Sequence, residues 1–140
     1  MTADLVKKLA RECGFELAGV APAIPIEEVA YYHQWVDHGY AGEMRYLTDR
    51  RADVRNDPRN LLPAARSVIC VGKLYNGPEP YSNRLRADDL AWISRYAWGE
   101  DYHDVLRRGL ERLVEKLHEH SREPFEWKIC VDTAPLLERS

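Results

Sequence analysis

The sequence lacks the features that would assign it to a membrane or to the secretory pathway. Its apolar runs are far shorter than the roughly 20 residues that a membrane-spanning helix needs. Its first ten residues, MTADLVKKLA, do not have the basic-then-apolar layout of a signal peptide. We therefore expect a cytoplasmic protein with no membrane partner.

Cysteine is scarce, and the three that occur, Cys13, Cys70 and Cys130, are far apart. They form no C-x-x-C pair and no other spacing typical of metal ligands. In a reducing compartment, free thiols within apolar runs behave as small buried hydrophobes. The spacing thus predicts buried, unpaired thiols and no metal or iron–sulfur site within this chain.

The self-contained catalytic motifs are missing as well. The chain has no G-x-G-x-x-G fingerprint, no P-loop, no G-x-S-x-G elbow and no H-E-x-x-H pair. Its length of 140 residues suits one domain, residues 1–140, around a single core. A formal net charge of −3 does not favour a general nucleic-acid binder, which is more often basic.

Positive charge is nevertheless concentrated in residues 45–73, which hold seven arginine and lysine side chains against three aspartates. Guanidinium groups match the geometry of phosphate oxygens, so this segment could meet phosphate groups of a ligand. The more ordinary explanation is a solvated surface on which the aspartates are interspersed. Charge alone does not decide between these two interpretations.

Apolar spacing predicts alternating helices and strands. Helical periodicity covers three segments, residues 2–14, 24–40 and 102–121. Apolar runs predict three strands, residues 15–22, 65–75 and 125–132. A further helix should follow Asp132. Residues 41–60 should be irregular with one helical turn at 44–47, and residues 76–89 should form a loop. This order indicates a layered α/β fold with three strands.

Several positions within these elements carry specific expectations. Thr2 should cap the first helix and Gly14 should end it. The continuous run from Val68 to Val71 is typical of a strand covered on both faces. Buried helix positions are expected at Ile26, Val29, Ala30 and Trp35, and at Val105, Leu106, Leu110, Leu113, Val114 and Leu117.

Asp132 stands at the end of the last predicted strand. In layered α/β folds, ligands gather at the carboxyl ends of the strands, so this position suits a functional acid. A carboxyl group in a low-dielectric pocket has a raised pKa and can serve as a general acid. Alternatively, Asp132 caps the following helix, with Pro135 tolerated in the first turn. Both interpretations remain open from position alone.

The stretch ISRYAWGEDYHDVLRR, residues 93–108, combines aromatic rings, charges and a glycine just before the longest predicted helix. Such a combination suits the wall of a pocket for a large flat ligand, with Gly99 allowing close approach of the backbone. Alternatively, Tyr96 and Trp98 are core anchors, and Asp101 or Asp104 is a helix N-cap.

Four strings in this order resemble the N-terminal part of the bacterial epoxyqueuosine reductase family: GYAGEMRYL, VRNDPRNLLPAARSVICVG, RYAWGEDYHDVLRRGLERL and VDTAPLLERS. The resemblance extends from about Leu5 to Ser140. It implies a nitroreductase-like cobalamin-binding domain. Members of this family reduce epoxyqueuosine to queuosine at the wobble position of certain tRNAs, using base-off cobalamin and two 4Fe-4S clusters.

The resemblance also assigns roles to residues at matching positions. Asp132, in the VDT block, corresponds to the family's proton donor and would also face the cofactor. Arg55 would contact the corrinoid, and Ser94 and Tyr96 would line the cofactor site. Three residues, Asp101, Tyr102 and His103, would face the substrate between the cobalt and the modified base.

The cysteine-rich region that holds the family's clusters has no counterpart in this chain. We therefore expect the N-terminal cobalamin-binding domain of a longer reductase, ending by truncation and inactive alone. Its expected partners are tRNA carrying epoxyqueuosine and an electron donor protein. The alternative is a stand-alone corrinoid-binding or trafficking module without reductase activity.

Overall fold

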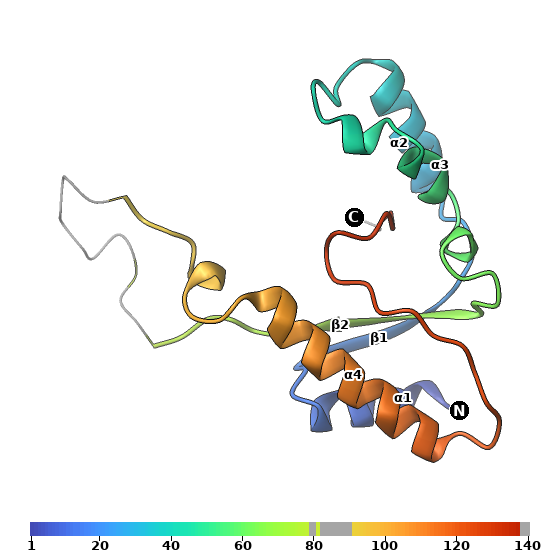
Figure 1. Ribbon diagram of the computed structural model, residues 1–140, viewed down its shortest axis with the longest axis vertical. Helices are drawn as coiled ribbons and strands as arrows, with labels where there is room; N and C mark the ends of the chain where they lie inside the picture. The colour runs from blue at the N-terminus through green and yellow to red at the C-terminus, as the bar shows by residue number, and fades with distance from the viewer. Residues whose placement is uncertain (79–80, 82–90, 138–140) are drawn as a thin grey trace.

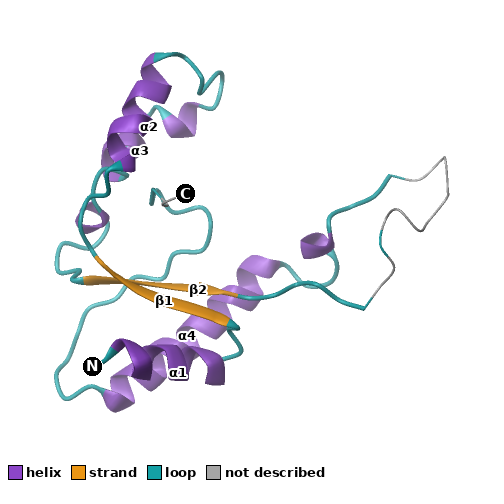
Figure 2. Ribbon diagram, turned by 180° about the vertical axis from the view of Figure 1, so that it is seen from behind, coloured by secondary structure: helices purple, strands orange, loops and turns teal. Residues whose placement is uncertain are grey.

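The computed structural model describes residues 1–78, 81 and 91–137 (Figure 1). Most of the loop expected over residues 76–89 therefore lies outside the described residues. Helices α1 and α4 lie on one side of the paired strands β1 and β2, while α2 and α3 form a separate lobe at the other end (Figures 1 and 2).

Helix α1 (Ala3–Glu12) begins and ends as its sequence predicts. The Thr2 hydroxyl accepts a hydrogen bond from the Leu5 N–H at 3.3 Å, which satisfies one of the free donors of the first turn. Gly14, with φ of +88°, follows the C-cap residue Cys13 and adopts the left-handed conformation that glycine favours.

Strands β1 (Leu17–Pro22) and β2 (Ser67–Gly72) pair antiparallel, with Leu17 opposite Gly72 and Pro22 opposite Ser67. The connection between them contains four short helical elements: α2 (Glu28–Asp37), η1 (Arg45–Leu47), α3 (Arg51–Val54) and η2 (Pro58–Asn60). The helical turn expected at 44–47 is confirmed by η1. Sequence analysis missed α3 and η2, since each is too short to show a period.

The prediction of a third strand over residues 125–132 is wrong. In the described part of the chain the sheet has two strands, and residues 125–131 run as an extended segment outside it. Of the alternating apolar residues, Val131 is buried and Phe125 and Ile129 are half-buried, whereas Trp127 is exposed. Phe125 stacks on His118 of α4 at 4.1 Å between ring centroids. The described residues after Asp132, which end at 137, form bends and irregular backbone and no helix.

The core lies between α1, α4 (Tyr102–His120) and one face of the sheet. Its buried residues are Val6, Leu9, Ala10, Cys13, Phe15, Leu113 and Leu117. Gly109 lets α4 approach closely, because a Cβ at this position would lie 2.7 Å from Cζ of Phe15. The predicted stripe on α4 is thus confirmed at Leu113 and Leu117, with Leu106 and Leu110 packed at the margin of the core.

The opposite face of the sheet has little cover, so the expectation of a strand buried on both faces is wrong. Side chains alternate across a strand, and only Ala18, Ile69 and Val71 pack against the helices. Cys70 points to the other face and is exposed, contrary to the expectation of a buried thiol. Cys13 is buried and Cys130 half-buried, and burial raises the pKa of both of these thiols.

Helix α2 is shorter than its predicted span and buries a different residue. Tyr32 is its buried side chain, and the Tyr32 hydroxyl donates a hydrogen bond to the Leu47 carbonyl. Val29 and Trp35 are half-buried, whereas Ala30 is exposed, contrary to prediction. Within the described residues, no helix combines the length and the apolar character needed to cross a membrane.

Candidate functional site

A cleft of about 1710 Å³ runs along α4, β2 and the extended segment after α4. Apolar side chains of all three elements line it, together with several aromatic rings. Tyr96, Tyr102 and Asp132, which sequence analysis singled out, are among the lining residues. The cleft therefore collects part of the predicted site from two segments that are about 30 residues apart in the chain.

The first turn of α4 supplies Tyr102, and Asp101 fixes where this turn begins. The Asp101 carboxylate accepts hydrogen bonds from the His103 N–H at 2.8 Å and contacts His103 Nδ1 at 2.9 Å. Both contacts lower the pKa of Asp101 below its usual range, and the hydrogen bond from the backbone N–H is the larger cause. The N-cap alternative is therefore confirmed for Asp101, whose carboxylate is occupied by its own helix.

The Tyr102 hydroxyl donates a hydrogen bond to Oδ2 of Asp132 at 2.5 Å. This bond, with a smaller contribution from burial, raises the pKa of Tyr102 to about 12. Tyr102 consequently stays protonated and remains a donor throughout the physiological pH range. The contact joins the two parts of the predicted site directly.

Asp132 has an unusual backbone conformation, with φ of +55°, the one positive φ outside glycine among the described residues. The Thr133 N–H donates to the Val131 carbonyl at 2.5 Å across Asp132, which makes Asp132 the centre of a three-residue γ-turn. Such a backbone is strained and persists only where surrounding contacts hold it.

Two expectations for Asp132 need correction. No helix follows it in residues 133–137, so it does not act there as a helix cap. Asp132 is also exposed, so the described residues do not supply the burial that the general-acid argument requires. Any enclosure of this carboxylate has to come from a bound molecule or from further polypeptide.

A row of aromatic rings leads along the cleft to Tyr102. Tyr75 and Tyr96 are 6.3 Å apart between ring centroids, and Tyr96 and Tyr102 are 5.6 Å apart, both in edge-to-face geometry. Tyr96 and Trp98 are 49% and 42% exposed, so neither is a core anchor. Their exposed rings fit the alternative interpretation, the wall of a pocket.

Arg55 and Ser94 are not among the residues that line the cleft. Arg55 is the C-cap residue of α3; its Nη1 donates to the Tyr46 carbonyl at 3.3 Å, and its guanidinium lies 6.0 Å from the Tyr32 ring centroid. Ser94 precedes η4 (Arg95–Ala97) as its N-cap residue. The cofactor roles of these two residues therefore stay predictions.

The basic segment is partly neutralised by its own aspartates. Arg51 pairs with Asp49 at 2.6 Å and Arg59 pairs with Asp57 at 2.5 Å, in each case two residues along the chain. These bonds lower the pKa of both aspartates, that of Asp49 to about 2. Arg51 and Arg59 therefore fit the more ordinary interpretation, a solvated surface with interspersed aspartates, and need no phosphate ligand.

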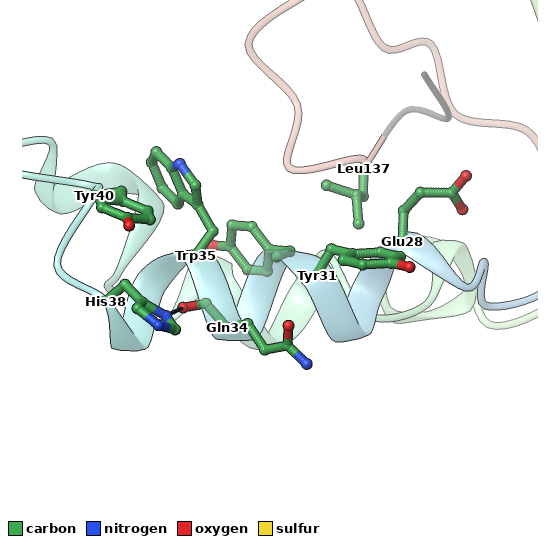
Figure 3. A pocket seen from close by; sticks show the side chains of 8 residues that line it. Glu28, Tyr31, Gln34, Trp35, His38, Tyr40 and Leu137 are labelled. Atoms are coloured by element: carbon green, nitrogen blue, oxygen red, sulfur yellow. Dashed lines mark hydrogen bonds between the residues drawn. The ribbon is translucent and has the colours of Figure 1, made fainter.

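Sequence analysis missed a second hollow, of about 510 Å³, on the exposed side of α2 (Figure 3). Tyr31, Trp35 and Tyr40 present their rings to it, and Leu137 reaches it from the end of the described chain. His38 contacts the Gln34 carbonyl at 2.6 Å. No residue predicted for the functional site lines this hollow.

The described residues contain no group of three or more histidine, cysteine or acidic side chains arranged to hold a metal ion. The three cysteines belong to different elements: Cys13 follows α1, Cys70 lies in β2 and Cys130 lies in the extended segment. A 4Fe-4S cluster needs four thiolates on one site, so these residues do not fit such a cluster.

Known proteins share both the sequence and the fold. Residues 55–133 match the protein family described as "Epoxyqueuosine reductase QueG, DUF1730". An epoxyqueuosine reductase of Xanthomonas campestris pv. campestris is 32% identical over 137 residues, which are 96% of this chain and 38% of the relative.

Solved structures agree with this match. The epoxyqueuosine reductase of Streptococcus thermophilus is 25% identical with a TM-score of 0.77, over 98% of this chain and 36% of that one. A crystal structure of an epoxyqueuosine reductase with an epoxyqueuosine-modified tRNA-Tyr stem loop shares the fold with a TM-score of 0.69, at 23% identity, over 96% of this chain and 35% of that one. The chain thus spans less than half of the length of the relatives that it matches. Because the family match covers more than half of the residues, the chain belongs to the epoxyqueuosine reductase family.

Proposed function

We propose that this chain is the cobalamin-binding part of an oxidoreductase that reduces epoxyqueuosine in tRNA to queuosine. The observation that carries the proposal is the position of Asp132, an exposed acid held by Tyr102 on the wall of a large cleft. Family membership supports the reaction class. The chain spans 38% of its Xanthomonas relative, and we infer that the complete activity draws on polypeptide beyond the matched part.

The cleft fits a large cofactor. Its volume of about 1710 Å³ exceeds the roughly 300–1,000 Å³ of most small-molecule sites, and its lining is mainly apolar and aromatic. When bound, cobalamin supplies the two electrons that the reduction needs. Tyr96 would contact the corrinoid through its exposed ring, and Arg55 and Ser94 would join it only if further polypeptide or the ligand extends the site to them.

Asp132 would provide a proton. Conversion of an epoxide to an alkene removes the oxygen as water, so the reaction consumes two electrons and two protons. Asp132, in its protonated form, would give one proton to the departing oxygen, and the electron pair of its O–H bond would stay on the carboxylate. Substrate bound in the cleft would cover Asp132 and exclude water from it.

The proposed partners follow from the reaction. A relative with the same fold has been crystallised with a modified tRNA stem loop, which supports tRNA as the substrate here. An electron donor protein would complete the cycle, and no step is assigned to iron–sulfur clusters within this chain. The second candidate is a corrinoid-binding module without reductase activity, which the cleft alone would equally support.

A chimera tests the proposal. Residues 1–140 of this chain would replace the matched residues of the Xanthomonas enzyme, and the gene would be expressed in bacteria that lack their own reductase. We expect queuosine to appear in the tRNA, measured by mass spectrometry of digested nucleosides. Epoxyqueuosine alone, in cells where the intact Xanthomonas enzyme restores queuosine, would contradict the reductase assignment and favour the corrinoid-binding module.

A further inference from the structure

The side chain of Tyr102 is used differently from what the family resemblance implies. The resemblance predicts that Tyr102 faces the substrate, but its hydroxyl is bonded to Oδ2 of Asp132 at 2.5 Å. Among the described residues, no other side chain donates a hydrogen bond to this carboxylate. The contact joins the first turn of α4 to the γ-turn at 131–133.

The ring of Tyr102 is itself held in place from two sides. Tyr96 meets it edge-on at 5.6 Å, and the His103 imidazole lies 4.0 Å away between ring centroids. Asp101 caps the helix and contacts His103, so the first turn of α4 has a defined start. Tyr102 is therefore a fixed point on a long helix rather than a mobile side chain.

Asp132 needs such a fixed point. Its positive φ is strained, and its side chain is exposed. The described residues after it, 133–137, are bends and irregular backbone, without a helix to anchor them. The hydrogen bond from the Tyr102 hydroxyl on α4 to the Asp132 carboxylate helps to keep Asp132 in this strained conformation.

We propose that Tyr102 is the positioning residue for Asp132, holding the carboxylate at the cleft and stabilising the charge left there once its proton has been given up. The proton step rests on the proposed function, whereas the holding of the loop does not. In that step the Asp132 O–H bond breaks, the proton goes to the departing oxygen, and the electron pair stays on Asp132. Tyr102 keeps its own proton, consistent with its pKa of about 12.

The contact can be tested on this 140-residue chain without any cofactor. The tyrosines would be labelled with 13C at Cζ and observed by NMR. The signal that is absent from the spectrum of Tyr102→Phe is assigned to Tyr102. We expect this signal to titrate near pH 12 in the wild type. In Asp132→Asn it should titrate nearer to about 10, the value for an unperturbed tyrosine. Asp104→Asn, on the same helix turn, should leave it unchanged; the same titration in wild type and Asp132→Asn would overturn the proposal.

The positioning role has its own readout. Tyr102→Phe should lower the heteronuclear NOE of the amides at 131–133, whereas Tyr31→Phe, on exposed α2, should not. In the chimera, Tyr102→Phe should reduce kcat about ten- to hundred-fold with little change in KM, because one hydrogen bond to a charged group is lost. Unchanged amides, or an unchanged kcat, would overturn the positioning role. If the wild-type chimera is inactive but the NMR results are as expected, the proposed function is contradicted, whereas the Tyr102–Asp132 contact is still supported.

Discussion

Replacing Asp132 by asparagine is expected to lower the rate of epoxyqueuosine reduction in the chimera by about 10²- to 10⁴-fold, the usual contribution of a general acid. An amide has nearly the same size and can accept the hydrogen bond from Tyr102, so the loop and the cleft should persist. What the amide lacks is an acidic proton for the departing oxygen. The measurement is single-turnover formation of queuosine in tRNA by the purified wild-type and variant proteins.

A matched control separates loss of the acid from loss of negative charge. Asp104 lies in the first turn of α4, is exposed, and does not line the cleft. Asp104→Asn should therefore retain nearly the wild-type rate. If Asp132→Asn also retained the full rate, the proton donor would be another group, and the assignment of Asp132 would be withdrawn.

Truncating Leu113 to alanine should have the largest effect on stability. Leu113 is 2% exposed and sits where α4 meets α1 and Phe15, so its removal leaves a cavity in the small core. Such substitutions cost about 2–5 kcal/mol, against a total stability of about 5–15 kcal/mol for a typical domain. The urea midpoint should fall by roughly 1–2.5 M at a denaturant slope of about 2 kcal/mol per M, the middle of the usual range.

Leu74→Ala provides the comparison, because Leu74 is 65% exposed in the segment after β2. Its substitution should change the unfolding free energy by no more than about 0.5 kcal/mol. Equal effects of the two substitutions would mean that the interface of α1 and α4 is not the stabilising core. Circular dichroism at 222 nm follows both transitions, since most of the ordered backbone is helical.

Local features of this fold could be predicted from the sequence because local chemistry determines them. The cap at Thr2, the left-handed Gly14 and the buried stripe of α4 each depend on residues within a few positions of one another. The N-cap at Asp101 belongs to the same class, since an aspartate two residues before a free N–H is a local signal.

Features that depend on distant pairing could not be predicted in the same way. Residues 125–131 have the alternating pattern of a strand, but a strand also needs a partner, which the pattern does not specify. The exposure of Cys70 depends on whether a layer covers its face of the sheet. The bond from Tyr102 to Asp132 spans 30 positions, and although the family resemblance placed both residues at the site, nothing in the sequence indicated a bond between them.

The buried Tyr32 illustrates a third kind of failure. Helical periodicity favoured the aliphatic positions of α2, but a tyrosine can bury its ring while its hydroxyl reaches a backbone carbonyl, here that of Leu47. The acceptor lies 15 residues away in η1, so the pairing is invisible in a window of one helix. The aromatic hollow beside α2 was missed for a related reason, because its lining includes Leu137, which is about 100 residues away from α2 in the chain.

The central claim, that this chain forms a cobalamin site beside Asp132, is tested most directly by titrating the 140-residue protein with cob(II)alamin. Visible absorbance and electron paramagnetic resonance report binding and the state of the lower axial ligand. We predict saturable binding with a base-off signature, weakened in Tyr96→Ala because the exposed ring that lines the cleft is lost. The absence of any saturable change, in this chain and equally in the chimera, would contradict the assignment of the cleft to cobalamin.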